Sequence, residues 1–130
     1  MLNHSAEKIS KLKNIDLWES YVLGWERADG TLSIKIDAVL LPNHEVYTKP
    51  TPEMWACYKK GKLQFKGVSS LEGYHELKSD RAATDASGEK DYGHIEEFKF
   101  TKLGDYYFEI EFAGPLKFKA KEIDFVLTNV

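Results

Sequence analysis

The sequence predicts a mainly β protein, an antiparallel meander that curls into a barrel or a sandwich, preceded by a short N-terminal helix. Three observations predict this fold. Apolar and polar residues alternate over most of the chain, tight-turn signals separate the alternating segments, and a helical period is confined to the first 14 residues. With 130 residues the chain has the size of one domain, which we expect to span 1–130, with a helical segment over 1–14 and a β body over 17–130.

The helical signals lie at the N-terminus. Ser5 can cap a helix that runs to Lys13, and Ile9 and Leu12 then share its buried side. Asn14 tolerates the left-handed backbone conformation, so we expect it to end this helix.

Asp29-Gly30 is the strongest turn signal in the sequence, because a type I′ turn requires positive φ at both of its central residues. A two-residue loop at this point predicts a hairpin with three pairs on one apolar face: Trp25 with Ile34, Leu23 with Ile36, and Tyr21 with Ala38. Lys60-Gly61 is predicted to turn a second hairpin, whose pairs are Tyr58 with Leu63 and Ala56 with Phe65.

Two later turns are predicted from the apolar pattern, at residues 102–104 and 113–115. They place five pairs on one shared apolar face: Phe98 with Phe108, Phe100 with Tyr106, Phe112 with Leu116, Ile110 with Phe118, and Phe108 with Ala120. The alternation slips once, at Lys121-Glu122, which predicts a β-bulge that helps the sheet to curl.

Two connections are longer than the usual length of about two to six residues, and long loops in compact domains often carry function. Residues 42–53 contain three prolines, which favour a rigid crossover between two sheets, or alternatively a preformed binding loop. Residues 78–93 are acidic, and Asp85-x-Ser87-x-Glu89-x-Asp91 begins like a calcium loop. Lys90 stands where such a loop needs glycine, so we expect a flexible or turn-forming acidic loop and no metal site.

No assembled catalytic site is expected. The four histidines lie at no spacing that fixes two of them on one element, so a zinc site built from His44, His75 and His94 is conceivable but not favoured. Cys57 is the single cysteine, and we expect a buried, inert thiol. The sequence contains no phosphate-binding glycine loop, nucleophile elbow or dinucleotide fingerprint. We therefore predict that the protein is not an enzyme and uses no cofactor.

The composition limits the partners. Eighteen Lys and Arg against 21 Asp and Glu give a net charge of −3, which argues against a dedicated nucleic-acid binder, although residues 55–66 interleave aromatic and basic side chains. Residues 66–130 carry the acidic excess, with 13 acidic against 9 basic side chains. The sequence shows no secretory signal and no apolar run long enough to cross a bilayer, which predicts a cytoplasmic protein without a membrane partner.

Two runs of residues resemble a family of small bacterial proteins of unknown function. The first run is Trp55-x-Cys57-Tyr58-Lys59-Lys60-Gly61-x-Leu63-x-Phe65-x-Gly67-Val68, and the second is Asp85-x-Ser87-Gly88-Glu89-x-Asp91-Tyr92-Gly93-His94-Ile95. The resemblance covers residues 31–113 and implies no activity or catalytic residue. In size, acidity and β content the chain is also similar to the immunity proteins of polymorphic toxin systems, which cover the active site of a toxin.

These observations favour a non-enzymatic interaction module of immunity type, which binds and blocks a partner protein with a basic surface. The residues expected to contact that partner are Asp85, Glu89, Asp91, Tyr92, His94, His44 and Tyr47. The alternative is a binder of small or lipophilic molecules that uses the interior of the curled sheet. The residues that would either line this interior or pack it solidly are Tyr21, Trp25, Phe98, Phe108 and Phe118. The oligomeric state is left open.

Overall fold

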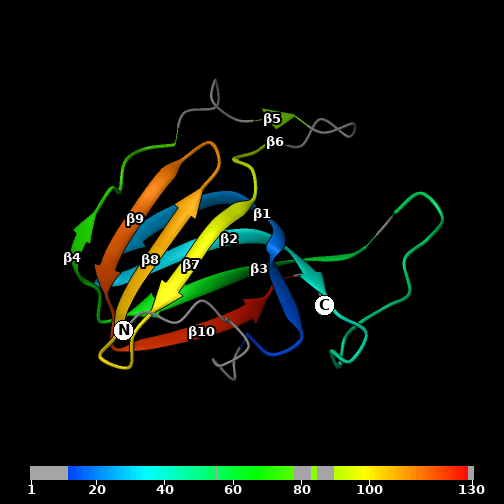
Figure 1. Ribbon diagram of the computed structural model, residues 1–130, viewed down its shortest axis with the longest axis horizontal. Helices are drawn as coiled ribbons and strands as arrows, with labels where there is room; N and C mark the ends of the chain where they lie inside the picture. Colours follow the sequence, from blue (N-terminus) through cyan, green and yellow to red (C-terminus); the bar gives the residue numbers. More distant parts are fainter. Residues whose placement is uncertain (1–11, 55, 78–82, 85–89, 129–130) are drawn as a thin grey trace.

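The computed structural model describes residues 12–54, 56–77, 83–84 and 90–128, and it confirms the prediction of a mainly β protein. Two antiparallel sheets of four strands each form the body of the molecule, and a two-stranded ribbon lies beside them (Figure 1). The two sheets do not close into a barrel.

The first sheet has the strand order β1-β2-β3-β10. Its strands are β1 (Ile15–Ala28), β2 (Thr31–Leu40), β3 (Cys57–Lys66) and β10 (Glu122–Leu127). The second sheet has the order β4-β9-β8-β7. Its strands are β4 (Ser69–Glu72), β7 (Ile95–Phe100), β8 (Asp105–Ile110) and β9 (Gly114–Lys119). The ribbon consists of β5 (Ala83–Thr84) and β6 (Lys90–Asp91).

The two sheets share one aromatic core. Phe65 of β3 is fully buried. Its ring meets three rings of the second sheet edge-on, with centroid distances of 5.0 Å to Tyr106, 5.6 Å to Phe108 and 4.8 Å to Phe118. Phe108 also stacks on Phe98, at 4.5 Å. Aromatic pairs in these arrangements add to the stability that burial alone provides, so Phe65 helps to hold the two layers together.

The predicted N-terminal helix is not supported. Residues 1–11 lie outside the described residues, and the part of the chain that the structure describes contains no α-helix. Leu12 is fully buried, as predicted, and Asn14 has a φ of 62°, the left-handed conformation expected of it. The chain therefore turns at Asn14 and enters β1 at Ile15.

The hairpin between β1 and β2 is confirmed at its turn. Asp29 and Gly30 have φ values of 51° and 76°, as a type I′ turn requires. The predicted pair of Trp25 with Ile34 is also present, which places Trp25 on the inner side of the strand.

The other two predicted pairs of this hairpin are wrong, because β1 contains a bulge. The observed pairs are Gly24 with Lys35, Val22 with Ile36, and Tyr21 with Asp37. Leu23 is therefore an extra residue that opposes no residue of β2. The inserted residue shifts the register, and Tyr21 lies on the outer face of the first sheet together with Asp37.

The predicted hairpin at Lys60-Gly61 does not exist. β3 runs without interruption through this position, and both of its edges are paired, one with β2 and one with β10. Gly61 is required by space rather than by a turn, because a Cβ at this position would lie 2.8 Å from the ring of Phe125 in β10.

The turn between β7 and β8 is confirmed, with both of its predicted pairs: Phe98 with Phe108, and Phe100 with Tyr106. The next turn lies two residues earlier than predicted. Its observed pairs are Ile110 with Gly114, Phe108 with Leu116, and Tyr106 with Phe118. Phe112, predicted to face the core, lies in this turn and is 43% exposed. A shift by two residues preserves the alternation, so the remaining apolar side chains still face the core.

Two corrections concern how the chain passes between the sheets. The slip at Lys121-Glu122 is not a bulge; it marks the point where the chain leaves β9 in the second sheet and enters β10 in the first. Residues 42–53 do not cross between sheets, because they connect β2 and β3, which are neighbours in the first sheet.

Candidate functional site

The bulge of β1 lies beside a pocket at the edge of the first sheet. Just before the bulge, this edge is bonded to the chain that leads into β7. Val22 donates its N–H to the carbonyl oxygen of Gly93 (2.9 Å), and Tyr92 donates its N–H to the carbonyl oxygen of Val22 (2.7 Å). The register changes at Leu23, and residues 23–25 then line the pocket. Bulges commonly redirect side chains beside binding sites, and this one directs Leu23 and Trp25.

Residues Gly73–Leu77, which we call the strap, form the opposite wall. They follow β4 directly and cross towards β1. Gly73 has a φ of 88°, and a Cβ at this position would overlap the carbonyl oxygen of Pro115 in β9. The strap therefore starts in direct contact with the backbone of β9. It reaches β1 at Trp25, whose indole Nε1–H donates to the His75 carbonyl oxygen at 2.7 Å.

The side chain of His75, in the middle of the strap, contacts two backbone carbonyl oxygens. Its Nε2 lies 2.9 Å from the carbonyl oxygen of Ala113, in the turn between β8 and β9, and its Nδ1 lies 3.0 Å from the carbonyl oxygen of Glu76. The imidazole also meets the Trp25 ring edge-on, with 5.3 Å between centroids. A neutral imidazole carries one N–H, and the tautomer with the hydrogen on Nε2 donates to the carbonyl oxygen of Ala113, which links the strap to the second sheet.

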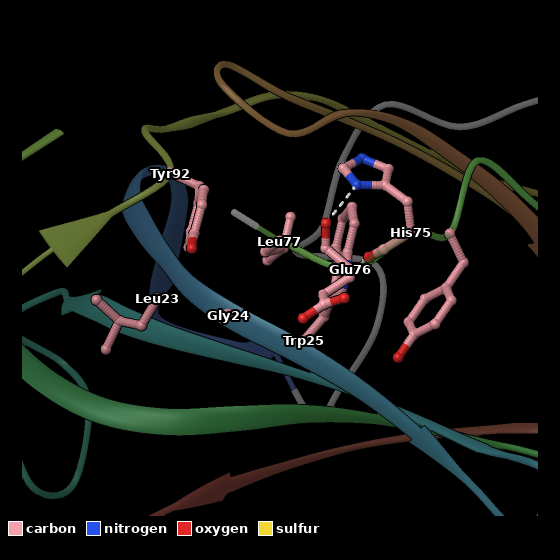
Figure 2. A pocket seen from close by; sticks show the side chains of 8 residues that line it. Leu23, Gly24, Trp25, His75, Glu76, Leu77 and Tyr92 are labelled. Atoms are coloured by element: carbon pink, nitrogen blue, oxygen red, sulfur yellow. Dashed lines mark hydrogen bonds between the residues drawn. The ribbon is translucent and has the colours of Figure 1, made fainter. Parts of the chain in front are cut away.

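The pocket between these walls has a volume of about 380 Å³ and is lined by residues 23–25, residues 74–77 and Tyr92. Figure 2 shows Glu76 extending its carboxylate over β1, while Tyr92 points its hydroxyl towards the same strand. The rings of Trp25 and Tyr74 lie 5.8 Å apart at a tilt of 31°. The site thus combines several aromatic rings with aliphatic side chains and one carboxylate.

The structure does not bring together the five residues predicted to line the interior of the sheet. Phe98, Phe108 and Phe118 are at most 2% exposed and pack in the core, where Phe108 contacts the other two. Trp25 lines the pocket at the sheet edge, and Tyr21 lies on the outer face of the first sheet.

The residues predicted to contact a partner protein are also divided. Asp85 and Glu89 lie outside the described residues. Asp91, Tyr92 and His94 lie at the end of β6 and in the chain that leads into β7, and Tyr92 joins Trp25 in the pocket. The surface expected around residues 85–91 therefore stays a prediction.

The other two predicted contact residues, His44 and Tyr47, lie in the loop between β2 and β3. This loop extends on the side of the molecule away from β4 in Figure 1. His44 lines a second pocket of about 480 Å³, between residues 44–46 and residues 124–127. Its Nδ1 accepts the N–H of Val46 at 3.2 Å, so the ring stabilises the local turn. Tyr92 and His44, one residue from each of the two predicted groups, thus line different pockets.

A polar cluster surrounds Tyr21 on the outer face of the first sheet. The Tyr21 ring lies 4.2 Å from the ring of His94 and 6.1 Å from that of Tyr58. Nδ1 of His94 lies 3.6 Å from the carboxylate of Glu111. Burial, followed by the negative charge that Tyr21 and Asp37 can carry, raises the pKa of Tyr58 to about 12.

Tyr58→Phe is expected to flatten the loss of stability at alkaline pH. Because the pKa of Tyr58 is raised from 10.0 to about 12, the folded protein holds this proton more tightly than the unfolded chain does. The resulting stabilisation is complete below pH 10.0 and is lost as the pH rises towards about 12. Urea unfolding of both proteins across this range measures the effect, with neutral pH as the baseline. Parallel curves of stability against pH would contradict the assignment.

Among the described residues, no group of three or more histidine, cysteine, aspartate or glutamate side chains is placed to hold a metal ion. Within the same part of the chain, no helical segment has the length and hydropathy needed to span a bilayer. Cys57 is buried, as predicted, and its Sγ lies 3.8 Å from Oγ1 of Thr48.

Comparisons with protein-family models, curated proteins and solved structures give no match. The resemblance to a family of small bacterial proteins therefore stays a prediction, and so do the bacterial origin and the cytoplasmic location. The function has to be inferred from the pocket itself.

The sequence singles out Trp25 and Tyr92 but gives no prediction for the strap. A signal is present, since Gly73 directly precedes Tyr74-His75-Glu76, a run of an aromatic ring, an imidazole and a carboxylate between two alternating segments. Metal-ligand spacing is the wrong test for His75, because this ring contacts backbone carbonyls.

Proposed function

We propose that this protein is a binding module that holds a small ligand in the pocket between β1 and the strap. The observation that supports the proposal is the way in which the strap is fixed around Trp25. Gly73 packs on Pro115, His75 contacts Ala113, and the Trp25 indole is bonded to the strap backbone. A wall held at three points is pre-organised, so a ligand does not have to order it on binding.

Binding rather than catalysis fits the chemistry of the pocket. Both ring nitrogens of His75 lie within 3.0 Å of backbone carbonyl oxygens, which favours a structural role for this side chain over that of a general base. Glu76 supplies a carboxylate, but none of the described lining residues is a serine, cysteine or lysine that could act as a nucleophile. The facing sheets serve, in this proposal, as a sandwich-like scaffold whose aromatic core is filled, which leaves the sheet edge for the ligand.

An interaction module for a basic protein is the second candidate. Acidic side chains flank the chain between β6 and β7: Asp91 accepts the N–H of Gly93 at 2.8 Å, and Glu111 accepts the N–H of His94 at 3.3 Å. A protein partner of this kind would present a basic side chain beside Tyr92, at the same pocket.

A small panel of probes tests the proposed ligand pocket. Choline, glucose, indole and inorganic phosphate are titrated separately into isotope-labelled protein. At least one of them is expected to shift the indole N–H signal of Trp25 and the amide signal of Gly24 in a saturable way, because both residues line the pocket. The Trp25 signal is identified as the one of three indole signals that Trp25→Phe lacks.

The controls separate the pocket from general surface effects. The amide of Leu103 is the internal reference, because this residue lies in the turn between β7 and β8 and is 86% exposed. Trp25→Leu is expected to abolish the response of Gly24, with the remaining amide signals reporting that the fold is kept. The proposal fails if no probe shifts Trp25, or if Leu103 responds as strongly as Trp25 does.

A further inference from the structure

We infer that the ligand of this pocket is a small organic cation, a compound with an alkylammonium group. The inference rests on the proposed function and adds the chemical class of the ligand. It follows from three properties of the lining residues, namely their charge, their hydrogen-bonding capacity and their aromatic rings.

The charge of the pocket is negative. Glu76 extends a carboxylate into it, and the described lining residues include no lysine or arginine (Figure 2). When the imidazole of His75 is uncharged, an anionic ligand would meet the Glu76 carboxylate with no lysine or arginine in the described lining to offset it, whereas a cation gains from the same arrangement.

The side-chain nitrogen atoms that line the pocket already face backbone carbonyl oxygens within the protein. The indole N–H of Trp25 is bonded to the His75 carbonyl oxygen. The two ring nitrogens of His75 face the carbonyl oxygens of Glu76 and Ala113. The side-chain groups left for a ligand are the Glu76 carboxylate, which only accepts when ionised, and the hydroxyls of Tyr74 and Tyr92.

The aromatic rings favour the same ligand. Trp25, Tyr74 and Tyr92 come from three separate segments and line one pocket of about 380 Å³. The faces of such rings carry negative charge density and attract cations, tryptophan most strongly, and quaternary ammonium groups are commonly recognised in this way. The volume is at the small end for ligand pockets, which suits a compact ammonium group better than a long lipid.

The experiment compares choline with its neutral carbon isostere, 3,3-dimethylbutan-1-ol. Both are titrated into the protein at about pH 8, where imidazole side chains ordinarily carry no charge. The indole signal of Trp25 is the readout. Choline is expected to bind at least about tenfold more tightly than the isostere, because only choline gains from the carboxylate and the ring faces. Glu76→Gln is expected to reduce this preference while leaving the affinity for the isostere unchanged.

A second arm identifies the source of the cation. A short peptide that contains trimethyllysine carries the same ammonium group on a polypeptide. Tighter binding of choline supports a free small molecule, as inferred here. Clearly tighter binding of the peptide would overturn that assignment and favour a protein partner.

The outcomes separate the inference from the function on which it rests. If the isostere or glucose shifts Trp25 as strongly as choline does, or if Glu76→Gln leaves the preference intact, the cation assignment is wrong and the ligand pocket stands. If none of the probes shifts the Trp25 signal, both the cation assignment and the proposed ligand pocket are wrong. Glu122→Gln is the matched control, because it also removes one carboxylate, from an exposed residue of β10 at the opposite edge of the first sheet from β1, and it is expected to leave choline binding unchanged.

Discussion

Replacement of Phe65 by alanine is expected to lower the free energy of unfolding by about 3–5 kcal/mol. The ring of Phe65 is fully buried and meets Tyr106, Phe108 and Phe118 of the opposite sheet. Removal of this ring leaves a cavity between the two sheets. Tyr106, Phe108 and Phe118 are held in β8 and β9, so they have little freedom to move in and fill the space. Urea unfolding, followed by circular dichroism, measures the loss.

Leu103→Ala is the matched control for this prediction. Leu103 is 86% exposed, so its truncation is expected to change the free energy of unfolding by less than about 0.5 kcal/mol. Phe65→Leu, which keeps part of the volume, is expected to fall between the two. If Phe65→Ala and Leu103→Ala proved equally stable, the two sheets could not share the core described above.

Gly73→Ala is expected to displace the strap and to destabilise the protein by about 1–3 kcal/mol. Two causes act together. The φ of 88° is strained for alanine, and the added methyl group would overlap the carbonyl oxygen of Pro115. Because His75 and Trp25 are bonded through the same strap, the Trp25 indole signal is expected to move and the response to pocket probes to weaken. Urea unfolding and the Trp25 signal measure the two effects separately.

Gly24→Ala is the control for a glycine-to-alanine change at the other wall of the pocket. A Cβ on Gly24 would meet no atom within 4 Å, and Gly24 is not among the residues with positive φ. This substitution is expected to leave the stability unchanged or to raise it by about 0.5–1 kcal/mol, since it restricts the unfolded chain. Equal stability of the two variants would show that Gly73 is not a fixed point of the strap.

The features of the fold that could be predicted from the sequence are those that depend on local chemistry. Asp29-Gly30 adopts the positive φ values of its turn, and Gly104 does so in the turn between β7 and β8. Lys60-Gly61 does not form the predicted turn, because the glycine is required by a contact with a distant part of the chain. It lies inside β3, where the missing side chain makes room for Phe125 of β10, a strand about 60 residues further along the chain. Sequence pattern alone does not distinguish these two uses of glycine.

The same distinction applies to the candidate site. Trp25 could be singled out on the apolar face of the first hairpin and Tyr92 in the acidic segment, but their meeting depends on the bulge at Leu23. An extra residue in a strand is visible in the sequence only when it moves a polar residue onto the apolar face. Val22 and Leu23 are both apolar, so either register places an apolar side chain on the inner face and the bulge is hidden. The strap depends on contacts with β1 and with the β8–β9 turn, both of which are distant in sequence. Such contacts follow from the tertiary arrangement and not from any local propensity.

The late position of β10 in the chain has a consequence for biosynthesis. β10 provides the outer neighbour of β3, and it is translated only after all the strands of the second sheet. Until residues 122–127 have emerged from the ribosome, the backbone N–H and C=O groups along that edge of β3 have no strand to pair with. The nascent chain thus exposes an unpaired strand edge, with the apolar side chains of Leu63 and Phe65 on one face of the strand. Incompletely folded chains with such edges are prone to self-association. Lysines at positions 60, 62 and 66 of the same strand place like charges along it, which discourages two unfinished chains from joining.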